Sequence, residues 1–252
     1  MKTITFTNQK GGVAKTTSVY NFGVGLNNRG FKVLLIDLDP QENLFFTAGI
    51  GDYDKTLYDV FKGECDVKDA IYNIKPSLDI LPAGLKMSMA DMEFNQPGRE
   101  HLLETHLKKV ERKYDYCIID TPPVLNVLLM NALTASNECI IPTEADAYSI
   151  KGVAQLSLFI DNIKAYCNKR LKIRGMLVTK YVANTEVAKS VEDFVNVAAK
   201  SLNTIVFNTR IRKGEAVKKS QLRQKDLYDA YPRENVTADY NAFIDEYLES
   251  SK

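Results

Sequence analysis

Residues 9–17 read QKGGVAKTT, and this loop lies between an alternating strand pattern in residues 2–8 and a helical pattern in residues 15–29. Gly11 and Gly12 allow successive backbone N–H groups to turn toward an anion, and the N-terminus of the following helix adds a favourable field. Lys15 supplies a positive charge for the β and γ phosphates, and Thr16 can offer its hydroxyl to Mg²⁺. The loop therefore predicts a phosphate site, with a plain glycine turn beside a surface lysine as the alternative.

The rest of the chain alternates short apolar segments with helical patterns. Residues 33–36 form a continuous apolar run, which is typical of a parallel strand buried on both faces. Further strands are expected at residues 78–81, 116–119, 139–141, 175–179 and 204–207, and helices at residues 55–62, 99–112, 126–135, 150–167 and 186–201. This order predicts an α/β fold over residues 1–252: a single-domain, doubly wound, mostly parallel sheet with helices on both faces.

The composition excludes several classes of protein. With 45% hydrophobic and 26% charged residues, the chain is neither collagenous, nor disordered, nor a disulfide scaffold. Its net charge of +1 means that any nucleic-acid surface must be a local patch. The four cysteines form no C-x-x-C pair and are expected to be free thiols. A polar N-terminus and the lack of any apolar run of about 18 residues predict a cytoplasmic protein.

Carboxylates follow two of the predicted strands, at the edge where parallel sheets bind ligands. Asp37 and Asp39 end the second strand and point the same way by strand alternation. Residues 114–123, YDYCIIDTPP, form another apolar strand that ends in Asp120. We expect these side chains to meet the phosphate loop at one edge of the sheet. The alternative is that Asp37 and Asp39 only cap the loop that follows them.

The loop variant K-G-G-x-x-K-T-T resembles the deviant Walker A motif of the ParA/MinD superfamily of P-loop NTPases. In this family the early lysine, matched by Lys10, crosses a dimer interface to the partner's nucleotide, so that two subunits enclose two ATP molecules. The resemblance implies nucleotide binding by Lys10, Gly11, Gly12, Val13, Ala14, Lys15, Thr16 and Thr17.

Residues 36–41, IDLDPQ, resemble the family's D-x-D-P-Q segment, in which the second aspartate orients the attacking water. This implies that Asp39 is a catalytic residue, together with Lys10 and Lys15.

The resemblance also implies a Mg²⁺ site. Asp120 matches the Walker B aspartate, which holds the ion through its water shell. Thr16 would offer its hydroxyl to the ion, and Asp37 would lie near it. ATP and Mg²⁺ are thus the expected cofactors.

The resemblance to small ParA/Soj proteins extends over roughly residues 1–250. Residues 144–156, EADAYSIKGVAQL, resemble the family's acidic loop and the helix after it, and residues 175–181, GMLVTKY, resemble its G-x-L-x-T-x-[YF] strand. Two positions depart from the family pattern. Ala14 stands at the usual second glycine of the loop, and Glu42 stands where a glycine commonly follows D-P-Q. Neither change removes a functional group.

A basic segment follows the last predicted strand, while the chain beyond residue 225 is acidic apart from Arg233. The basic residues are Arg210, Arg212, Lys213, Lys218, Lys219, Arg223 and Lys225. Because the family binds DNA nonspecifically through arginines in this region, the resemblance implies DNA contacts by Arg210, Arg212, Lys213 and Arg233. A solvated basic loop is the alternative.

The resemblance implies a Mg²⁺-dependent ATPase for plasmid or chromosome partition. ATP would drive a sandwich homodimer that binds DNA nonspecifically and is nucleoid-associated. Slow hydrolysis, stimulated by a ParB-like centromere-binding adaptor, would release the dimer. Because the sheet begins at Lys2, no N-terminal helix-turn-helix extension is expected.

Other functions use the same loop. A MinD-like membrane switch is disfavoured, because the polar side of the last helical pattern, residues 240–248, is acidic rather than basic. No membrane partner is therefore expected. A relative of the nitrogenase iron protein would need a cysteine pair that bridges an iron–sulfur cluster, whereas Cys117 and Cys139 lie in predicted strands. A nucleotide-dependent regulator with little turnover is left for an assay to exclude.

Overall fold

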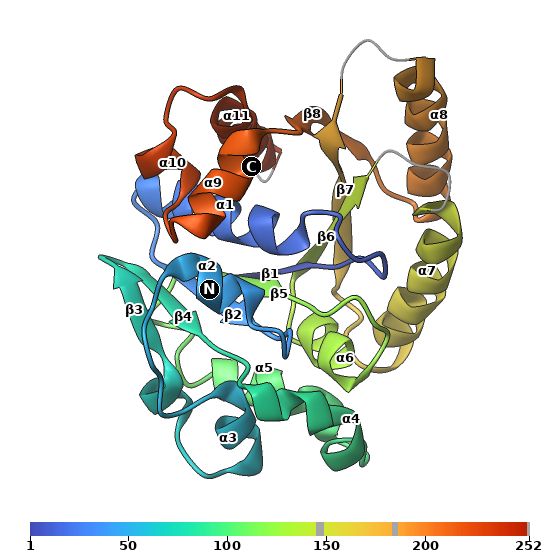
Figure 1. The fold of residues 1–252 in the computed structure, drawn as a ribbon. Coiled ribbons are helices and arrows are strands. Elements are labelled where there is room, and N and C mark those ends of the chain that lie inside the picture. Colours follow the sequence, from blue (N-terminus) through green and yellow to red (C-terminus); the bar gives the residue numbers. More distant parts are fainter. Residues whose placement is uncertain (145–148, 183–185, 251–252) are drawn as a thin grey trace.

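The computed structural model describes residues 1–144, 149–182 and 186–250. Within them, eight strands form one sheet in the order β3-β4-β2-β5-β1-β6-β7-β8, with helices on both faces (Figure 1). The strand pairs are parallel, except that β3 is antiparallel to β4. The strands are β1 (Lys2–Phe6), β2 (Val33–Asp37), β3 (Tyr72–Lys75), β4 (Leu78–Leu81), β5 (Tyr116–Asp120), β6 (Glu138–Glu144), β7 (Lys172–Tyr181) and β8 (Val206–Arg212). This is the doubly wound, mostly parallel α/β sheet that the sequence predicts.

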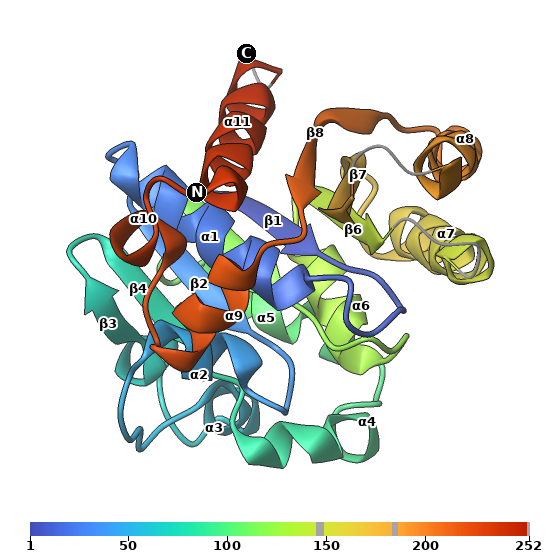
Figure 2. The same cartoon turned by 45° about the horizontal axis from the view of Figure 1, so that its top comes forward.

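Two groups of helices cover the sheet (Figure 2). One face carries α1 (Lys15–Asn28), α2 (Asn43–Ala48), α9 (Glu215–Leu222), α10 (Leu227–Ala230) and α11 (Asn235–Glu249). The other carries α3 (Leu57–Lys62), α4 (Ala90–Glu93), α5 (Leu102–Leu107), α6 (Val127–Thr134), α7 (Ser149–Tyr166) and α8 (Glu186–Ser201). Short 3₁₀ turns lie at η1 (Val67–Ala70), η2 (Leu85–Met89) and η3 (Arg99–His101).

Alternate residues of each central strand enter different cores. Val33 and Leu35 of β2 pack under α1, whereas Leu34 and Ile36 pack on the opposite face. A strand buried on both sides needs apolar residues at every position, which is why β2 reads as a continuous hydrophobic run.

The C-terminal helix α11 belongs to the core. The Phe22 ring of α1 lies 5.4 Å from the ring of Phe243 and 5.2 Å from that of Tyr247, measured between centroids, and both α11 residues are fully buried. The Glu246 carboxylate accepts hydrogen bonds from the backbone N–H groups of Asn208 (2.6 Å) and Thr209 (2.8 Å) on β8. Helix α11 therefore anchors the edge strand β8 and satisfies donors that an uncovered edge would leave open.

Most of the predicted elements are confirmed, with bounds shifted by a few residues, but two differ and several short elements were not predicted. Strand β8 runs from Val206 to Arg212 rather than over residues 204–207, so Arg210 and Arg212 lie in the strand and not after it. The helix expected at residues 99–112 is shorter, because η3 precedes α5 and α5 ends at Leu107. The hairpin strand β3 was not predicted, since four half-exposed edge residues carry no apolar run, and the short helices α2, α4, α9 and α10 were not predicted either. Residues 145–148 of the expected acidic loop lie outside the described residues.

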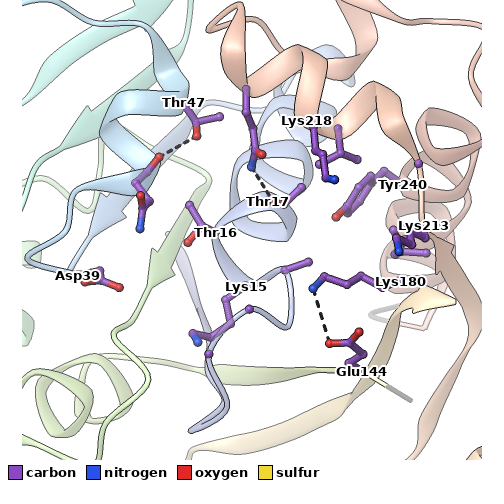
Figure 3. Close-up of a pocket in the computed structure, with 18 of the residues that line it drawn as sticks. Lys15, Thr16, Thr17, Asp39, Thr47, Glu144, Lys180, Lys213, Lys218 and Tyr240 are labelled. Carbon is purple, nitrogen blue, oxygen red and sulfur yellow. Dashed lines mark hydrogen bonds and ion pairs between the residues drawn. The ribbon is translucent and has the colours of Figure 1, made fainter. Parts of the chain in front are cut away.

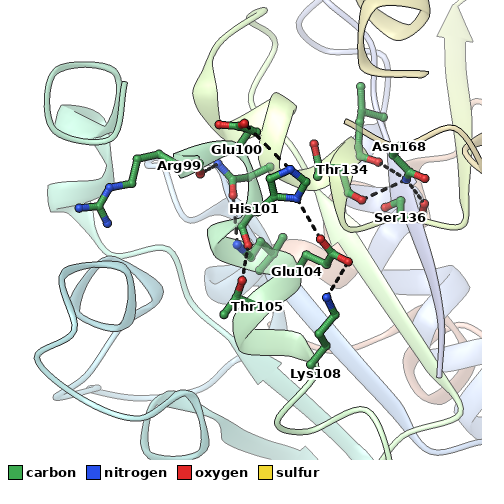
Figure 4. A network of polar contacts seen from close by, with 12 residues as sticks. Arg99, Glu100, His101, Glu104, Thr105, Lys108, Thr134, Ser136 and Asn168 are labelled. Carbon is green, nitrogen blue, oxygen red and sulfur yellow. Dashed lines mark hydrogen bonds and ion pairs between the residues drawn. The ribbon is translucent and has the colours of Figure 1, made fainter. Parts of the chain in front are cut away.

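The half-buried side chain of Asn168 caps the end of α6. The Asn168 side chain donates to the carbonyl oxygens of Leu133 (2.9 Å) and Ser136 (2.7 Å), which lie at the end of α6 and just after it (Figure 4). Beside it, His101 contacts Glu104 at 3.0 Å. The Asn168 contacts satisfy carbonyls that the helix leaves without partners, so we assign this network to stability.

The two residues that stand at positions where the family has glycine, Ala14 and Glu42, both have a left-handed backbone conformation. Ala14, at the N-cap of α1, has φ 58°, and Glu42, at the N-cap of α2, has φ 54°. An L-residue in this region costs about 1–2 kcal/mol, which a glycine avoids. Glu42 compensates through its carboxylate, which accepts hydrogen bonds from the Tyr53 hydroxyl (2.7 Å) and from the backbone N–H of Gly84 (3.2 Å). Ala14 has no polar side chain with which to compensate.

We expect Ala14→Gly to stabilise the protein by up to about 1 kcal/mol, because release of left-handed strain exceeds the entropic cost of glycine. Thermal and urea denaturation measure the change. The control is Ala238→Gly on the exposed side of α11, which should cost about 1 kcal/mol as an ordinary helix interior substitution. Equal destabilisation by both changes would show that Ala14 is not strained.

Candidate functional site

The phosphate loop connects β1 to α1 and is fastened to strands β6 and β7. The Asn8 side chain donates to the carbonyl oxygen of Pro142 (2.7 Å) and accepts from the backbone N–H of Lys10 (3.0 Å). The Thr179 hydroxyl donates to the carbonyl oxygen of Val13 (3.1 Å). The sequence analysis assigned no part to Asn8 or Thr179, because such support depends on strands that are distant along the chain. These contacts preorganise the loop.

A cavity of about 740 Å³ opens beside the loop (Figure 3). This volume lies in the range of cofactor and nucleotide sites. One end is formed by Gly11, Gly12, Ala14, Lys15, Thr16 and Thr17. The other end is formed largely by the segment after β7, including Ile211, Gly214, Val217, Gln221 and Tyr240. A phosphate end and a partly apolar end match a ligand that carries phosphates on one side and a base on the other.

Lys15, Thr16 and Asp120 form the buried centre of the site. The Thr16 hydroxyl donates to Asp120 Oδ2 at 2.6 Å, and Asp120 Oδ1 has no hydrogen-bond partner among the described residues. Burial raises the pKa of Asp120 to about 7, although the Thr16 hydrogen bond and the Lys15 charge oppose the rise. Burial also lowers the pKa of Lys15, against the attraction of Asp120 and Asp39. The site thus places a buried acid and a buried lysine side by side at the phosphate end of the cavity.

Asp37 and Asp39 have different surroundings. Asp37 is fully buried, and its carboxylate accepts from the backbone N–H groups of Asp39 (3.0 Å), Leu44 (3.1 Å) and Phe45 (3.1 Å). It therefore caps α2, the alternative considered from the sequence, while it remains the register partner of Asp120 on the adjacent strand. Burial is the main cause that raises the pKa of Asp37. Asp39 lines the cavity.

Lys10 lies at the start of the loop and is partly exposed. Its Nζ is 3.8 Å from Glu144 Oε2 at the end of β6. The same oxygen lies 3.6 Å from the Nζ of Lys180, a residue that also lines the cavity and that the sequence analysis did not select. Figure 3 shows Lys180 and Glu144 facing one another beside the loop.

The basic residues expected to contact DNA are in different situations. Arg212 forms a two-pronged ion pair with Asp239 of α11, at 2.6 Å from Nη2 to Oδ1 and 2.9 Å from Nε to Oδ2. The Arg210 guanidinium donates to the carbonyl oxygens of Phe207 and Asn208. Lys213 lines the cavity, and Arg233 is exposed in the turn before α11. Arg212, Lys213 and Arg233 are all exposed, and Arg212 Nη2 also donates to the carbonyl oxygen of Asn235 (3.3 Å), two residues after Arg233.

The fold and this site together define a P-loop nucleotide-binding protein. The chain matches the family model described as an AAA domain over residues 1–173. It is 37% identical over 197 residues to the chromosome partitioning protein ParA of Caulobacter vibrioides, which covers 76% of this chain and 74% of that protein. It is 39% identical over 192 residues to the sporulation initiation inhibitor protein Soj of Bacillus subtilis, with coverage of 74% and 75%. The chain belongs to the ParA/Soj family of partition ATPases.

Solved structures share the whole fold. Cobyrinic acid a,c-diamide synthase of Mycobacterium smegmatis, with a bound ATP analogue and magnesium, superposes with a TM-score of 0.85 at 29% identity, covering 100% of this chain and 97% of that one. A plasmid partition protein of Borrelia burgdorferi has a TM-score of 0.77 at 25% identity, with coverage of 99% and 98%. Among the residues described here, no helix has the length and apolar character needed to cross a bilayer.

The buried Asp120 predicts a pH-dependent stability. Because its pKa is about 7 in the folded protein and 3.8 for the ordinary side chain, the folded state binds the proton more tightly. The free energy of unfolding should then fall as the pH rises from about 4 to 7, and the deficit persists above that range.

We expect Asp120→Asn to raise the melting temperature of the nucleotide-free protein at pH values near 8, with a gain that shrinks toward pH values near 4. Thermal denaturation without Mg²⁺ measures this. Asp52→Asn, at an exposed loop position, is the control and should leave the profile unchanged. Lower stability of Asp120→Asn near pH 8 would mean that Lys15 and Thr16 more than offset the cost of burial.

Proposed function

We propose that this protein is a Mg²⁺-dependent ATPase of plasmid or chromosome partition, which forms an ATP-dependent dimer on DNA and is released by slow hydrolysis. The observation that carries the proposal is the convergence of Lys15, Thr16, Asp39 and Asp120 at one end of a nucleotide-sized cavity. Membership of the ParA/Soj family supports the partition function.

The nucleotide would bind with its phosphates on the loop and its base between β8, α9 and α11. Backbone N–H groups of residues 11–17 and the Lys15 ammonium group would bind the β and γ phosphates. Thr17 lines the same end, where its hydroxyl accepts a hydrogen bond from Gln221 of α9 at 3.1 Å. Gln221 thus links the phosphate end to the helix that borders the base.

The residues present fit a magnesium ion. Asp120 Oδ1 is a buried acceptor without a partner among the described residues, and it lies on the carboxylate that already accepts from Thr16. Thr16 and Asp120 would hold the ion, in part through water, with Asp37 as a buried neighbouring charge. When bound, Mg²⁺ would neutralise charge that develops on the phosphates. It would also favour the ionised form of Asp120.

Asp39 would position the water that attacks the γ phosphate. Asp39 Oδ1 accepts a hydrogen bond from the backbone N–H of Gln41 at 3.0 Å. The backbone N–H of Asp39 in turn donates to Asp37 Oδ1. These bonds set the orientation of Asp39 without use of all its acceptor capacity. Catalysis in this reaction class comes from positioning and electrostatic stabilisation rather than covalent chemistry.

Lys10 would act on the nucleotide of the partner subunit. Its side chain is about one third exposed beside Glu144, so it can move outward when a partner approaches. An ammonium group supplied across the interface makes dimer formation depend on the nucleotide. This is how ATP would control assembly.

DNA binding would follow from assembly. Lys213, Lys218, Lys219, Arg223 and Lys225 lie on or beside α9, and all five are exposed. Arg233 is exposed on a nearby turn, while Arg212 would act mainly through its bond to Asp239, which holds α11 against β8. Because a dimer doubles the phosphate contacts in one rigid footprint, affinity should rise steeply on dimerisation. A ParB-like adaptor is proposed as the partner that stimulates hydrolysis.

Two other functions have less support. A MinD-like membrane helix would need an apolar face free to enter lipid, whereas Phe243, Ile244 and Tyr247 of α11 are buried in the core. A regulator with little turnover shares the nucleotide site and differs only in its rate, so a phosphate-release assay separates it from an ATPase.

The two loop lysines should behave differently. Lys15→Ala should abolish binding of ATP, because its ammonium group serves the phosphates of its own subunit. Lys10→Ala should retain much of the affinity for ATP but lose the dimer and turnover. Calorimetry, light scattering and phosphate release measure these properties. Normal dimerisation and hydrolysis by Lys10→Ala would contradict the sandwich arrangement.

Asp39→Ala should trap an ATP-bound dimer. Contacts to the nucleotide persist, whereas the attacking water is no longer oriented, so the hydrolysis rate falls while dimer formation is retained. Size-exclusion chromatography with ATP and a single-turnover assay give the two readouts. Unchanged turnover would mean that another group positions the attacking water, and Asp37 and Asp120 would be the next candidates.

Arg233→Glu should weaken DNA binding without loss of the ATP-bound dimer, since Arg233 lies in a surface turn. Arg212→Glu should also lower the melting temperature, because it places a carboxylate against Asp239. Mobility shifts on unrelated duplexes should show little sequence preference. The logarithm of the affinity for DNA should fall with the logarithm of the salt concentration, with a slope of roughly 0.9 per neutralised phosphate. An ATP-bound dimer that ignores DNA at low salt, or binds anionic vesicles instead, would contradict partition.

A further inference from the structure

Lys180 lies where strand β7 reaches the phosphate loop. The residue before it, Thr179, is fully buried and donates its hydroxyl to the carbonyl oxygens of Val13 (3.1 Å) and Thr143 (3.2 Å). This contact fixes the end of β7 against the loop. Lys180 is therefore held at a set position on the cavity wall.

The backbone at Lys180 directs its side chain toward the site. Its φ of 52° is left-handed, a conformation that lysine rarely adopts, and the pairing of β7 with β8 is irregular between Val178 and Tyr181. Along a regular strand, Thr179 and Lys180 would point to opposite faces. Here both side chains reach the phosphate loop. Local irregularities of this kind re-aim side chains beside active sites, and a strained residue is a reason to look for function.

The ammonium group of Lys180 lies between Glu144 and Gly12 of the phosphate loop. Nζ lies 3.6 Å from Glu144 Oε2, and a Cβ placed on Gly12 would stand 3.9 Å from it. Lys180 Nζ therefore lies beside Gly12, where no side chain separates the backbone of the loop from a ligand. Its side chain remains 39% exposed, so the charge can be reached from the cavity.

The position along the cavity indicates what Lys180 would contact. Figure 3 shows Lys180 between Lys15, at the phosphate end, and Tyr240, at the other end. A nucleotide that spans the two ends has its ribose, and the phosphate attached to it, at this middle position. Ribose hydroxyl and phosphate oxygens are both acceptors for a lysine ammonium group.

We propose that Lys180 is a nucleotide-contacting residue, which binds the nucleotide where the ribose joins the phosphate chain, and that Glu144 is the positioning residue that aims it. This inference rests on the proposed function, because it requires a nucleotide in the cavity. ADP and ATP share the ribose and the first phosphate. Lys180 should therefore contribute equally to both, unlike Lys10, whose contribution depends on the ATP-bound dimer.

The test is calorimetric titration of the full chain with ADP and with ATP, each with Mg²⁺, at a protein concentration at which ADP leaves the chain monomeric. Lys180→Met should raise the Kd for both nucleotides about tenfold, as expected for loss of one charge-assisted hydrogen bond. Lys180→Arg keeps the charge and should retain most of the affinity. The matched control is Lys172→Met, an exposed lysine at the other end of β7, which should change neither Kd.

A second variant separates charge from backbone. Asparagine tolerates the left-handed conformation, so Lys180→Asn should fold at least as stably as the natural chain, with the melting temperature as the check. It should nevertheless bind ADP as weakly as Lys180→Met. Normal affinity in Lys180→Asn would overturn the proposal, because it would assign the effect of the methionine variant to backbone strain.

The part of Glu144 is tested by a double-mutant cycle. The effect of Lys180→Met on the Kd for ADP should be smaller in a Glu144→Gln background than in the natural one, since the ammonium group is no longer aimed. Equal effects in the two backgrounds would overturn the positioning role. If the natural chain binds ADP and Lys180→Met binds it equally well, this inference fails alone. If the natural chain binds neither nucleotide, the proposed function fails with it.

Discussion

The site is built around the hydrogen bond from the Thr16 hydroxyl to the buried carboxylate of Asp120. This carboxylate lies at the carboxyl end of β5, between β1 and β2, and it faces Thr16 and Lys15 at the start of α1. Parallel pairing of these three strands brings the phosphate loop and the two carboxylate segments to one edge of the sheet. A charge that is costly to bury is tolerated there because a cation, a hydroxyl and an incoming ligand share its surroundings.

The site contains several conformational and electrostatic features that lower stability, and the packing of the core offsets them. Ala14, Glu42 and Lys180 all have left-handed backbones around the cavity, and burial raises the pKa of both Asp37 and Asp120. Such strain persists only where the surrounding structure over-determines it. The fully buried strands and the aromatic contacts between α1 and α11 provide that support. Stability and function are therefore arranged in different parts of the same sheet, with the ligand site at its strained edge.

The C-terminal segment performs two tasks that are physically linked. Strand β8 and helices α9 and α11 form the wall opposite the phosphate loop, and β8 and α9 also carry the basic residues Arg210, Arg212, Lys218 and Lys219. The Arg212 to Asp239 pair and the Glu246 contacts hold this wall together. Because Lys213 and Lys218 border the cavity itself, a ligand in the cavity changes the electrostatic field of the surface proposed to meet DNA.

The sequence was sufficient to predict the α/β class, the phosphate loop, and the strand ends at Asp37, Asp39 and Asp120, because each depends on a local pattern: apolar periodicity, glycines before a helix, or acids after a buried run. It also identified the family. The folded structure was needed to show that Asp37 caps α2 and that Arg212 is paired with Asp239. It was likewise needed to show that Asn8 and Thr179 fasten the loop and that Lys180 faces the cavity. Those outcomes depend on which residues meet across the sheet from positions far apart in the chain, and no local pattern encodes such a meeting.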